Sequence, residues 1–172
     1  MQIWYFPIFW TAVFDFTAWA IIHLGYAYLI TMVPLRLFNP RKSLFKIRSW
    51  EKSGQIYQKL FQVKKWKKKL PDGAALFQKG FKKKRLKSRN PVYLERFLRE
   101  TCRAELAHWM VLAAAPLFFL WNPLWAGYVN VAYALIVNLP CIITQRYNRP
   151  CFFRLLSKHH SNKTLEERSV LI

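Results

Sequence analysis

Residues 104–145 read AELAHWMVLAAAPLFFLWNPLWAGYVNVAYALIVNLPCIITQ. This stretch holds two apolar runs, at about residues 104–121 and 124–144, and Asn122-Pro123 between them is a turn signal. A helix needs about 20 mainly apolar residues to cross the hydrocarbon core of a bilayer, and each run approaches that length. The stretch therefore predicts a transmembrane hairpin.

A third apolar run lies upstream, from Ile3 to Val33, where no Lys or Arg occurs and the only acidic or histidine side chains are Asp15 and His23. One tilted helix of this length spans about 30 Å of hydrocarbon. Two short helices are the alternative, and they would move the N-terminus to the inner side. Because no charged segment precedes the run and no clear small-residue cleavage site follows it, we expect it to be retained.

The charges are segregated along the chain. The 172 residues carry a formal net charge of +20 although 53% of them are hydrophobic, a combination that is rare in soluble domains. No Lys or Arg precedes Arg36, 22 lie from Arg36 to Arg103, and the last 6 lie from Arg146 onward. Since Lys and Arg accumulate on the cytoplasmic side, the basic loop and tail are expected inside, with the N-terminus and the Asn122 turn outside.

These patterns predict an all-α membrane protein with about three transmembrane helices and amphipathic interfacial helices in a basic cytoplasmic loop. The expected location is the cell membrane, with membrane lipids as partners. The expected segments, all in one domain, are a first transmembrane helix (1–35), a basic cytoplasmic loop (36–103), a transmembrane hairpin (104–145) and a cytoplasmic tail (146–172).

The basic loop has a pattern of its own. Ile56, Leu60 and Val63 continue an apolar stripe through a lysine-rich run, which is typical of a helix in the membrane interface whose lysines are attracted to anionic headgroups. A Pro-Asp-Gly turn at residues 71–73 ends this helix. Asn-Pro at residues 90–91 then offers a cap, from which one helix can continue into the second span.

Glu105 and His108 are the first candidates for chemistry, because ionisable groups are costly at the mouth of a membrane span. At about 100° per residue the two share a helix face with Trp109. A neutral imidazole accepts a proton from a hydroxyl nucleophile, and a carboxylate can orient the ring. The alternative is an interfacial pair that only hydrogen-bonds its neighbours.

Other polar residues have two interpretations each. Asn138 either forms a hydrogen bond to another helix or contacts substrate. Arg146 and Arg149 suit either headgroup anchoring or the binding of phosphate or carboxylate. Asp72 is either the cap of a following helix or a functional carboxylate. Asp15 in the first span favours packing or a homo-oligomer contact.

Several classes of function are not supported by motifs. The three cysteines lack CxxC spacing, and no acidic or Cys partner lies near His159-His160, so no metal or redox cofactor is predicted. Nucleotide-binding, serine-hydrolase and zinc-protease motifs are absent. Nucleic-acid binding by the lysine run is not expected, because polybasic loops beside membrane spans are more simply lipid-facing.

A set of short motifs spans about 100 residues. They are Lys65-Trp66-Lys67 with 70–73, then Glu100-Thr101 and 103–106 before His108-Trp109, and finally Asn130, Tyr133-Ala134, Asn138, Pro140 and 145–150. In their order and spacing these motifs resemble one family, the small membrane glycosyl-4,4′-diaponeurosporenoate acyltransferases of staphyloxanthin-type carotenoid pathways.

The resemblance implies transfer of a fatty acyl group to a sugar hydroxyl of a glycosylated carotenoid or similar glycolipid, with acyl-CoA or an acyl carrier protein thioester as co-substrate. On this basis we expect His108 as general base and Glu105 as its orienting carboxylate, with Asp72 as the alternative partner. The expected substrate-binding residues are Arg103, Arg146, Asn148, Arg149, Trp66, Trp109 and Asn138. Cys102 keeps a route through an acyl-enzyme open.

A different class of function explains the charge and the spans equally well. A non-enzymatic polybasic membrane protein would bind anionic lipids or tether partner enzymes. This alternative does not explain why Glu105 and His108 share a helix face at the mouth of a membrane span. It predicts that His108→Ala is silent, while charge reversal across residues 64–69 is damaging.

Overall fold

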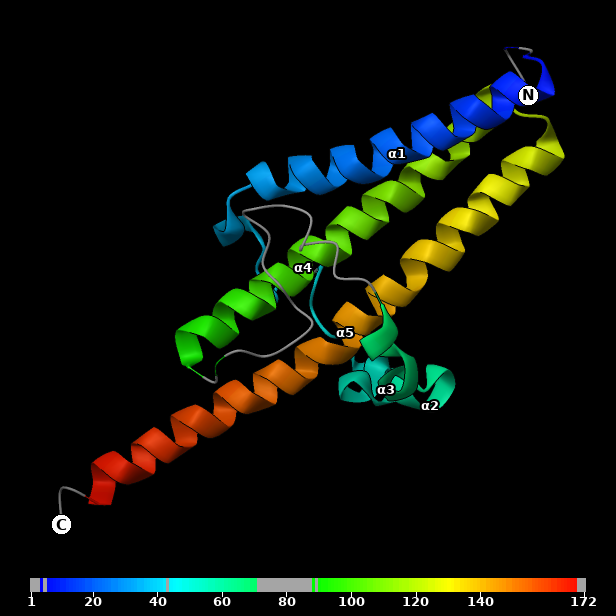
Figure 1. The fold of residues 1–172 in the computed structure, drawn as a ribbon. Coiled ribbons are helices and arrows are strands. Elements are labelled where there is room, and N and C mark those ends of the chain that lie inside the picture. Colours follow the sequence, from blue (N-terminus) through cyan, green and yellow to red (C-terminus); the bar gives the residue numbers. More distant parts are fainter. Residues whose placement is uncertain (1–3, 5, 43, 71–87, 89, 170–172) are drawn as a thin grey trace. The chain divides into compact units, whose positions relative to one another are not determined.

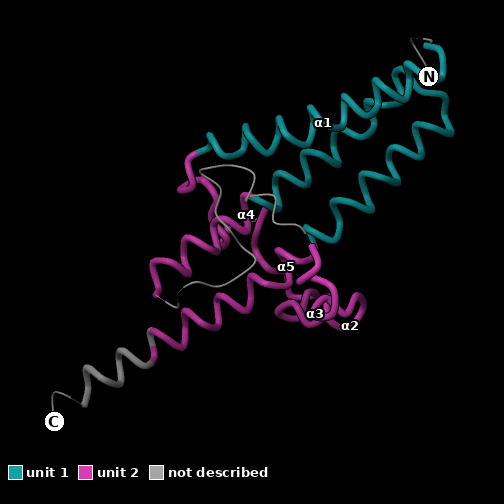
Figure 2. Tube along the Cα trace, in the orientation of Figure 1, with its two compact units in different colours: residues 1–33, 104–142 teal, residues 34–103, 143–172 magenta. Residues whose placement is uncertain are grey.

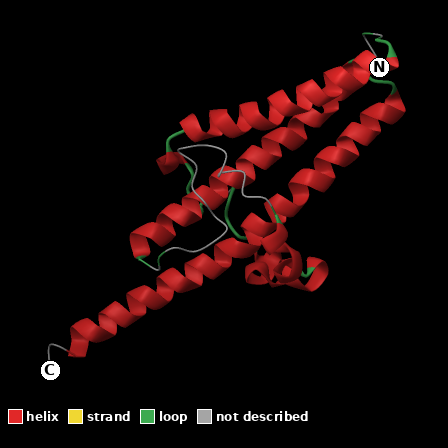
Figure 3. Cartoon of the chain, in the orientation of Figure 1, coloured by secondary structure: helices red, strands yellow, loops and turns green. Residues whose placement is uncertain are grey.

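The structure is a computed structural model that describes residues 4, 6–42, 44–70, 88 and 90–169. These residues form helices and connecting loops, with no β-strand among them (Figures 1 and 3). In chain order the elements are α1 (Ile8–Met32), η1 (Leu35–Leu37), η2 (Ser49–Gly54), α2 (Gln55–Phe61), α3 (Val63–Trp66), η3 (Lys67–Lys69), α4 (Pro91–Ala114), η5 (Ala115–Leu120) and α5 (Leu124–Ser169), where η marks a 3₁₀ helix. The predicted all-α class is confirmed.

Three helical stretches are long and apolar enough to cross a membrane: Ile8–Met32, Pro91–Leu120 and Leu124–His159. The prediction of about three transmembrane helices is therefore confirmed. The first stretch is one continuous helix, so the alternative of two short helices does not hold. Helix α5 continues past residue 146, where the tail was expected to begin, and ends at Ser169.

The hairpin forms where its sequence signals lie. Asn90 caps α4, its Oδ1 accepting a hydrogen bond from the backbone N–H of Val92 at 2.9 Å, and Pro91 takes the first helical position. At the C-terminal end of η5 the backbone N–H of Asn122 donates to the carbonyl of Phe118 at 3.1 Å. The turn predicted at Asn122 follows, and α5 begins after it.

The chain divides into two compact units, each made of two separate stretches (Figure 2). Unit 1 comprises Met1–Val33 and Ala104–Ile142. Unit 2 comprises Pro34–Arg103 and Ile143–Ile172. Helices α4 and α5 each contribute residues to both units.

Unit 1 has an aromatic core with a carboxylate at one end. Trp19 stacks on Phe118, with ring centroids 4.3 Å apart, and both are buried. Asp15 accepts hydrogen bonds from the Trp121 indole at 2.7 Å, the Asn122 amide at 2.8 Å and the Asn130 amide at 3.0 Å. The predicted packing contact of Asp15 is thus a set of hydrogen bonds within the chain, to Asn130 on α5 and to the turn before it.

Unit 2 holds the amphipathic segment, which comprises α2 and α3, against α5. Tyr57 and Val63 are buried in a cluster with Tyr147. The expected interfacial helix is broken at Gln62, which adopts the left-handed conformation at φ 49°, so α2 and α3 form in its place. Because of this break Val63 turns inward while Leu60 stays 64% exposed, and the apolar stripe read from the sequence is divided between the core and the surface.

Candidate active site

His108 on α4 and Asn138 on α5 contact each other within unit 1. Nδ1 of His108 lies 2.8 Å from Oδ1 of Asn138. The Asn138 side chain is completely buried, and its Nδ2 donates to the carbonyl of Ala134 at 2.9 Å. The amide is therefore held at both ends, and it holds the half-buried imidazole in turn.

These contacts define the tautomer of His108. The Asn138 nitrogen is directed at a carbonyl, so the amide oxygen faces the ring, and that oxygen can only accept a hydrogen bond. In the neutral imidazole the proton then lies on Nδ1 and the basic lone pair lies on Nε2. An imidazole held in this way is suited to take a proton through Nε2.

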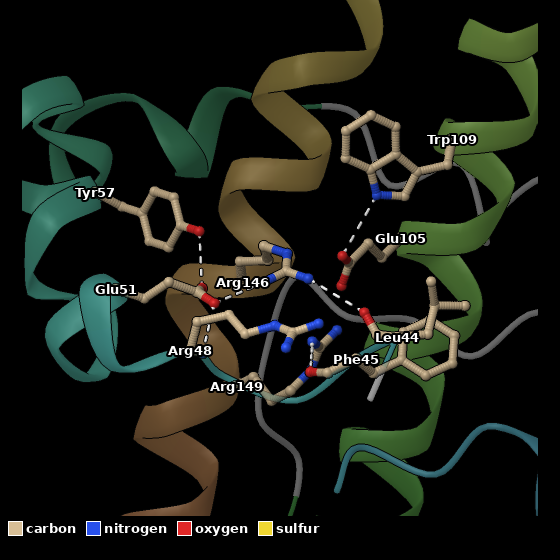
Figure 4. Close-up of polar contacts among 9 residues, drawn as sticks. All are labelled: Leu44, Phe45, Arg48, Glu51, Tyr57, Glu105, Trp109, Arg146 and Arg149. Carbon is tan, nitrogen blue, oxygen red and sulfur yellow. Dashed lines mark hydrogen bonds and ion pairs between the residues drawn. The ribbon is translucent and has the colours of Figure 1, made fainter. Parts of the chain in front are cut away.

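Glu105 lies one helical turn before His108 on α4 and is only 1% exposed. The indole N–H of Trp109 donates to its Oε1 at 3.4 Å (Figure 4). Trp109 itself is 45% exposed, which leaves its ring surface accessible. The contact at Nδ1 of His108 is made with Oδ1 of Asn138. An orienting role of Glu105 stays a prediction, and Asp72, the alternative partner, lies outside the described residues.

Two of the arginines predicted to bind substrate have protein partners in unit 2. Arg103 Nη1 lies 3.1 Å from a carboxylate oxygen of Glu100. Arg149 is completely buried, donating from Nη1 to the carbonyl of Phe45 at 2.6 Å and from Nε to the hydroxyl of Thr101 at 3.3 Å. These bonds attach the loop at Phe45 to α5, and a substrate-binding role for either arginine stays a prediction.

Arg146 meets a buried carboxylate that the sequence analysis missed. Its Nη1 lies 2.7 Å from Oε1 of Glu51, which also accepts from the backbone N–H of Arg48 at 2.8 Å, while Oε2 accepts from the Tyr57 hydroxyl at 2.8 Å (Figure 4). Burial, and next the hydrogen bond to Glu51, raise the pKa of Tyr57 well above its usual range. A signal was present, because Glu51 is the only acidic residue among 12 basic ones in residues 36–69.

Two further predicted substrate-binding residues, Trp66 and Asn148, lie in unit 2. Lys67 Nζ donates to Oδ1 of Asn148 at 2.8 Å and lies 4.8 Å from the ring centroid of Tyr147. Burial lowers the pKa of the Lys67 ammonium. The indole N–H of Trp66 donates to the carbonyl of Phe61 at 2.6 Å. Trp66 and Asn148 thus take part in packing the amphipathic segment.

The predicted site residues fall into two groups. Unit 1 brings together Glu105, His108, Trp109 and Asn138, and unit 2 holds Trp66, Arg103, Arg146, Asn148 and Arg149. The Cys102 thiol is completely buried. Within the described part of the chain, no three His, Cys, Asp or Glu side chains are grouped so as to hold a metal ion.

Comparison with known proteins identifies one family, both by a family model and by individual relatives. A family model described as glycosyl-4,4′-diaponeurosporenoate acyltransferase matches residues 40–158. The protein of that name from Staphylococcus aureus strain USA300 is 39% identical over 146 residues, covering 85% of this chain and 88% of the relative. The protein of that name from strain bovine RF122 is 38% identical over the same shares. No solved structure matches the chain.

Proposed function

The chain belongs to the glycosyl-4,4′-diaponeurosporenoate acyltransferase family, and on that premise we propose that it transfers a fatty acyl group from an acyl thioester to a sugar hydroxyl of a glycosylated carotenoid or similar glycolipid. The contact between His108 and Asn138 carries the proposal, because it prepares one imidazole nitrogen as a base.

The acceptor is an amphiphile in this proposal. The relatives are named for a glycosylated diaponeurosporenoate, whose polyene is apolar and whose sugar is polar. Helix α1 leaves large apolar side chains such as Ile8, Phe16 and Ile21 exposed, as a protein in contact with hydrocarbon requires. A chain with three membrane-spanning helices can meet such an acceptor without its leaving the bilayer.

In the proposed reaction the sugar oxygen attacks the thioester carbonyl carbon while Nε2 of His108 takes the hydroxyl proton. A carbon–oxygen bond forms, and the carbonyl electrons move to the oxygen. When the tetrahedral intermediate collapses, the carbon–sulfur bond breaks, and the departing thiolate takes the proton from the imidazolium. The products are an ester and a thiol. General base catalysis of this kind contributes about 10²- to 10⁴-fold in rate.

Glu105 and Trp109 support the same chemistry. We assign the buried carboxylate of Glu105, one turn from His108, to stabilising the imidazolium that forms during the reaction. Trp109 holds that carboxylate through its N–H and offers its exposed ring to the sugar or the polyene. Asn138 is the residue that orients His108.

The thioester donor would approach from the basic, cytoplasmic side. The support is the charge pattern, with 22 basic residues from Arg36 to Arg103 and none before Arg36. On this arrangement the Asn122 turn and the N-terminus face outside. A cysteine placed at Trp125, beside the turn and 72% exposed, should then react with an impermeant thiol reagent on intact cells, whereas one at Lys59 in the loop should not.

The test is mass spectrometry of lipid extracts from cells that make a glycosylated C30 carotenoid acid. The cells carry wild type, His108→Ala, His159→Ala or no protein; His159 is an exposed histidine on α5 and serves as the matched control. We expect an acylated glycoside with wild type and His159→Ala only. Acylated product from His108→Ala at the wild-type level would overturn the role of His108, and its absence from well-expressed wild type would overturn the reaction.

A further inference from the structure

Unit 2 contains a pocket that the proposed chemistry does not use. Its volume is about 330 Å³. It lies between the loop after α1, the turn at Ser53 and α5. Three basic side chains and an apolar floor line it: Arg41, Lys46 and Arg154, with Pro40, Pro150 and Phe153. A pocket that combines cations with apolar surface matches a ligand that carries both anionic groups and a flat apolar body.

The cations of this pocket differ from the other arginines of unit 2. Arg146 and Arg149 are engaged by Glu51 and by the carbonyl of Phe45. Arg41, Lys46 and Arg154 are exposed, and none has an acidic partner within ion-pair distance among the residues the structure describes. Arg154 donates from Nη2 to the neutral Cys151 sulfur at 3.3 Å, which is a weak acceptor. The charge of the three side chains is therefore available to an anionic ligand, and the forked guanidinium groups suit phosphate oxygens.

The floor is preformed. Pro40 and Pro150 are buried and Phe153 is half-buried, so these rings keep their positions without a ligand. The side of the pocket at Ser53 is equally fixed, because Lys52 and Ser53 adopt the left-handed conformation at φ 46° and 53°. Non-glycine residues adopt that conformation at a cost and persist in it only where the surroundings enforce it. Here the buried Glu51, immediately before, provides the anchor.

We propose that this pocket binds the phosphate-bearing nucleotide head of a coenzyme A thioester, with the phosphates on Arg41, Lys46 and Arg154 and the adenine on the apolar floor. The inference rests on the proposed function for the thioester. The volume lies at the lower end of the range of about 300–1,000 Å³ for small-molecule sites, which suits one part of a long donor. A lipid phosphate has related chemistry but no planar ring, and the ring floor favours the nucleotide.

The test uses the full chain in nanodiscs of phosphatidylcholine alone, with adenosine 3′,5′-bisphosphate as the probe. This probe carries neither acyl group nor thioester, so its binding is independent of acyl transfer. The pocket variant is Arg41→Gln/Lys46→Gln/Arg154→Gln. The matched control is Lys59→Gln/Lys68→Gln/Lys69→Gln, which removes the same charge from exposed positions in the same unit. We expect wild type and control to bind alike and the pocket variant at least about tenfold more weakly, as loss of several charge-assisted bonds requires.

Equal nucleotide binding by wild type and the pocket variant would overturn the inference, and loss of binding to phosphatidylglycerol vesicles in that variant would then identify a lipid site. Equal weakening of nucleotide binding in the control would also overturn it. The single variant Arg154→Gln, at an exposed position, should weaken binding severalfold and covers the case in which the triple variant misfolds. Nucleotide binding without acyl transfer would overturn the proposed function alone, whereas acyl transfer from coenzyme A without nucleotide binding would overturn the pocket alone.

Discussion

Glu51 and Arg146 form an ion pair at 2.7 Å although 95 residues separate them in the sequence. The carboxylate is completely buried, and the Arg146 side chain is 16% exposed. Burying a charge is costly unless partners compensate it, and here Arg146, the backbone of Arg48 and the hydroxyl of Tyr57 do so. The pair thereby ties the amphipathic segment to α5.

Replacing Glu51 by Ala should destabilise the protein by about 3–5 kcal/mol, because it leaves Arg146 and the Tyr57 hydroxyl without their buried acceptor. The measurement is the midpoint of thermal unfolding in detergent, monitored by size-exclusion chromatography of the protein that remains folded. Glu95→Ala, at an exposed position on α4, should shift the midpoint little. A midpoint for Glu51→Ala equal to that of Glu95→Ala would contradict the structural role of the pair.

The Tyr57 hydroxyl gives this network a dependence on alkaline pH. Its pKa is raised above the ordinary value of 10.0, first by burial and then by Glu51. Above that value the unfolded tyrosine loses its proton while the folded one keeps it, so stability falls as pH rises, by up to about 1.4 kcal/mol per pH unit. Denaturant unfolding at pH 9 to 11 should show a steeper loss for wild type than for Tyr57→Phe; parallel pH profiles would count against the pKa shift.

Gly54 and Gly25 should respond to alanine in opposite directions. Gly54 has φ +84°, and a Cβ there would lie 3.2 Å from the carbonyl oxygen of Tyr147. Gly25 lies within α1, with no atom within 4 Å of an added Cβ. Gly54→Ala should cost about 1–2 kcal/mol through strain, and Gly25→Ala should stabilise by about 0.5–1 kcal/mol. The same unfolding assay checks both, and stabilisation by Gly54→Ala would contradict the left-handed turn.

The spans and turns were predictable because their causes are local. An apolar run of sufficient length specifies a membrane helix, and Asn90-Pro91 and Asn122-Pro123 specify where helices begin and end. The break at Gln62 was not predictable in the same way. Gln62 adopts the left-handed conformation, which a glutamine in the sequence does not indicate. The break forms because it allows Val63 to be buried against Tyr147.

The partners of the site residues were only partly accessible to sequence reasoning. Helical periodicity places Glu105 and His108 on one face of α4, which the structure retains. Periodicity cannot identify which residue of another helix meets that face, so interhelical hydrogen bonding was one of two roles predicted for Asn138, but its partner His108 could not be named. Glu51 was missed for the same reason, since its partner Arg146 lies on a distant helix.

Asp15 should contribute to the stability of unit 1. It accepts three side-chain hydrogen bonds, and Asp15→Leu removes all of them. Single interhelical bonds of this kind contribute about 0.6 kcal/mol each in membrane proteins, so a loss of about 2 kcal/mol is expected. Titration with sodium dodecyl sulfate in mixed micelles measures it. Thr17→Ala, whose hydroxyl donates only within α1, is the control, and the two variants should differ clearly.

Asn138→Ala tests whether orientation of His108 matters for the reaction. The change removes the acceptor at Nδ1, so the imidazole loses its fixed tautomer and position. Part of the general-base contribution of about 10²- to 10⁴-fold should then disappear, lowering kcat at least about tenfold with little change in KM for the acceptor. Val137→Ala, at the exposed neighbouring position, should retain wild-type kcat. A purely structural role for Asn138 would lower the amount of folded enzyme and leave kcat per folded molecule unchanged, so kcat normalised to folded protein decides between the two roles.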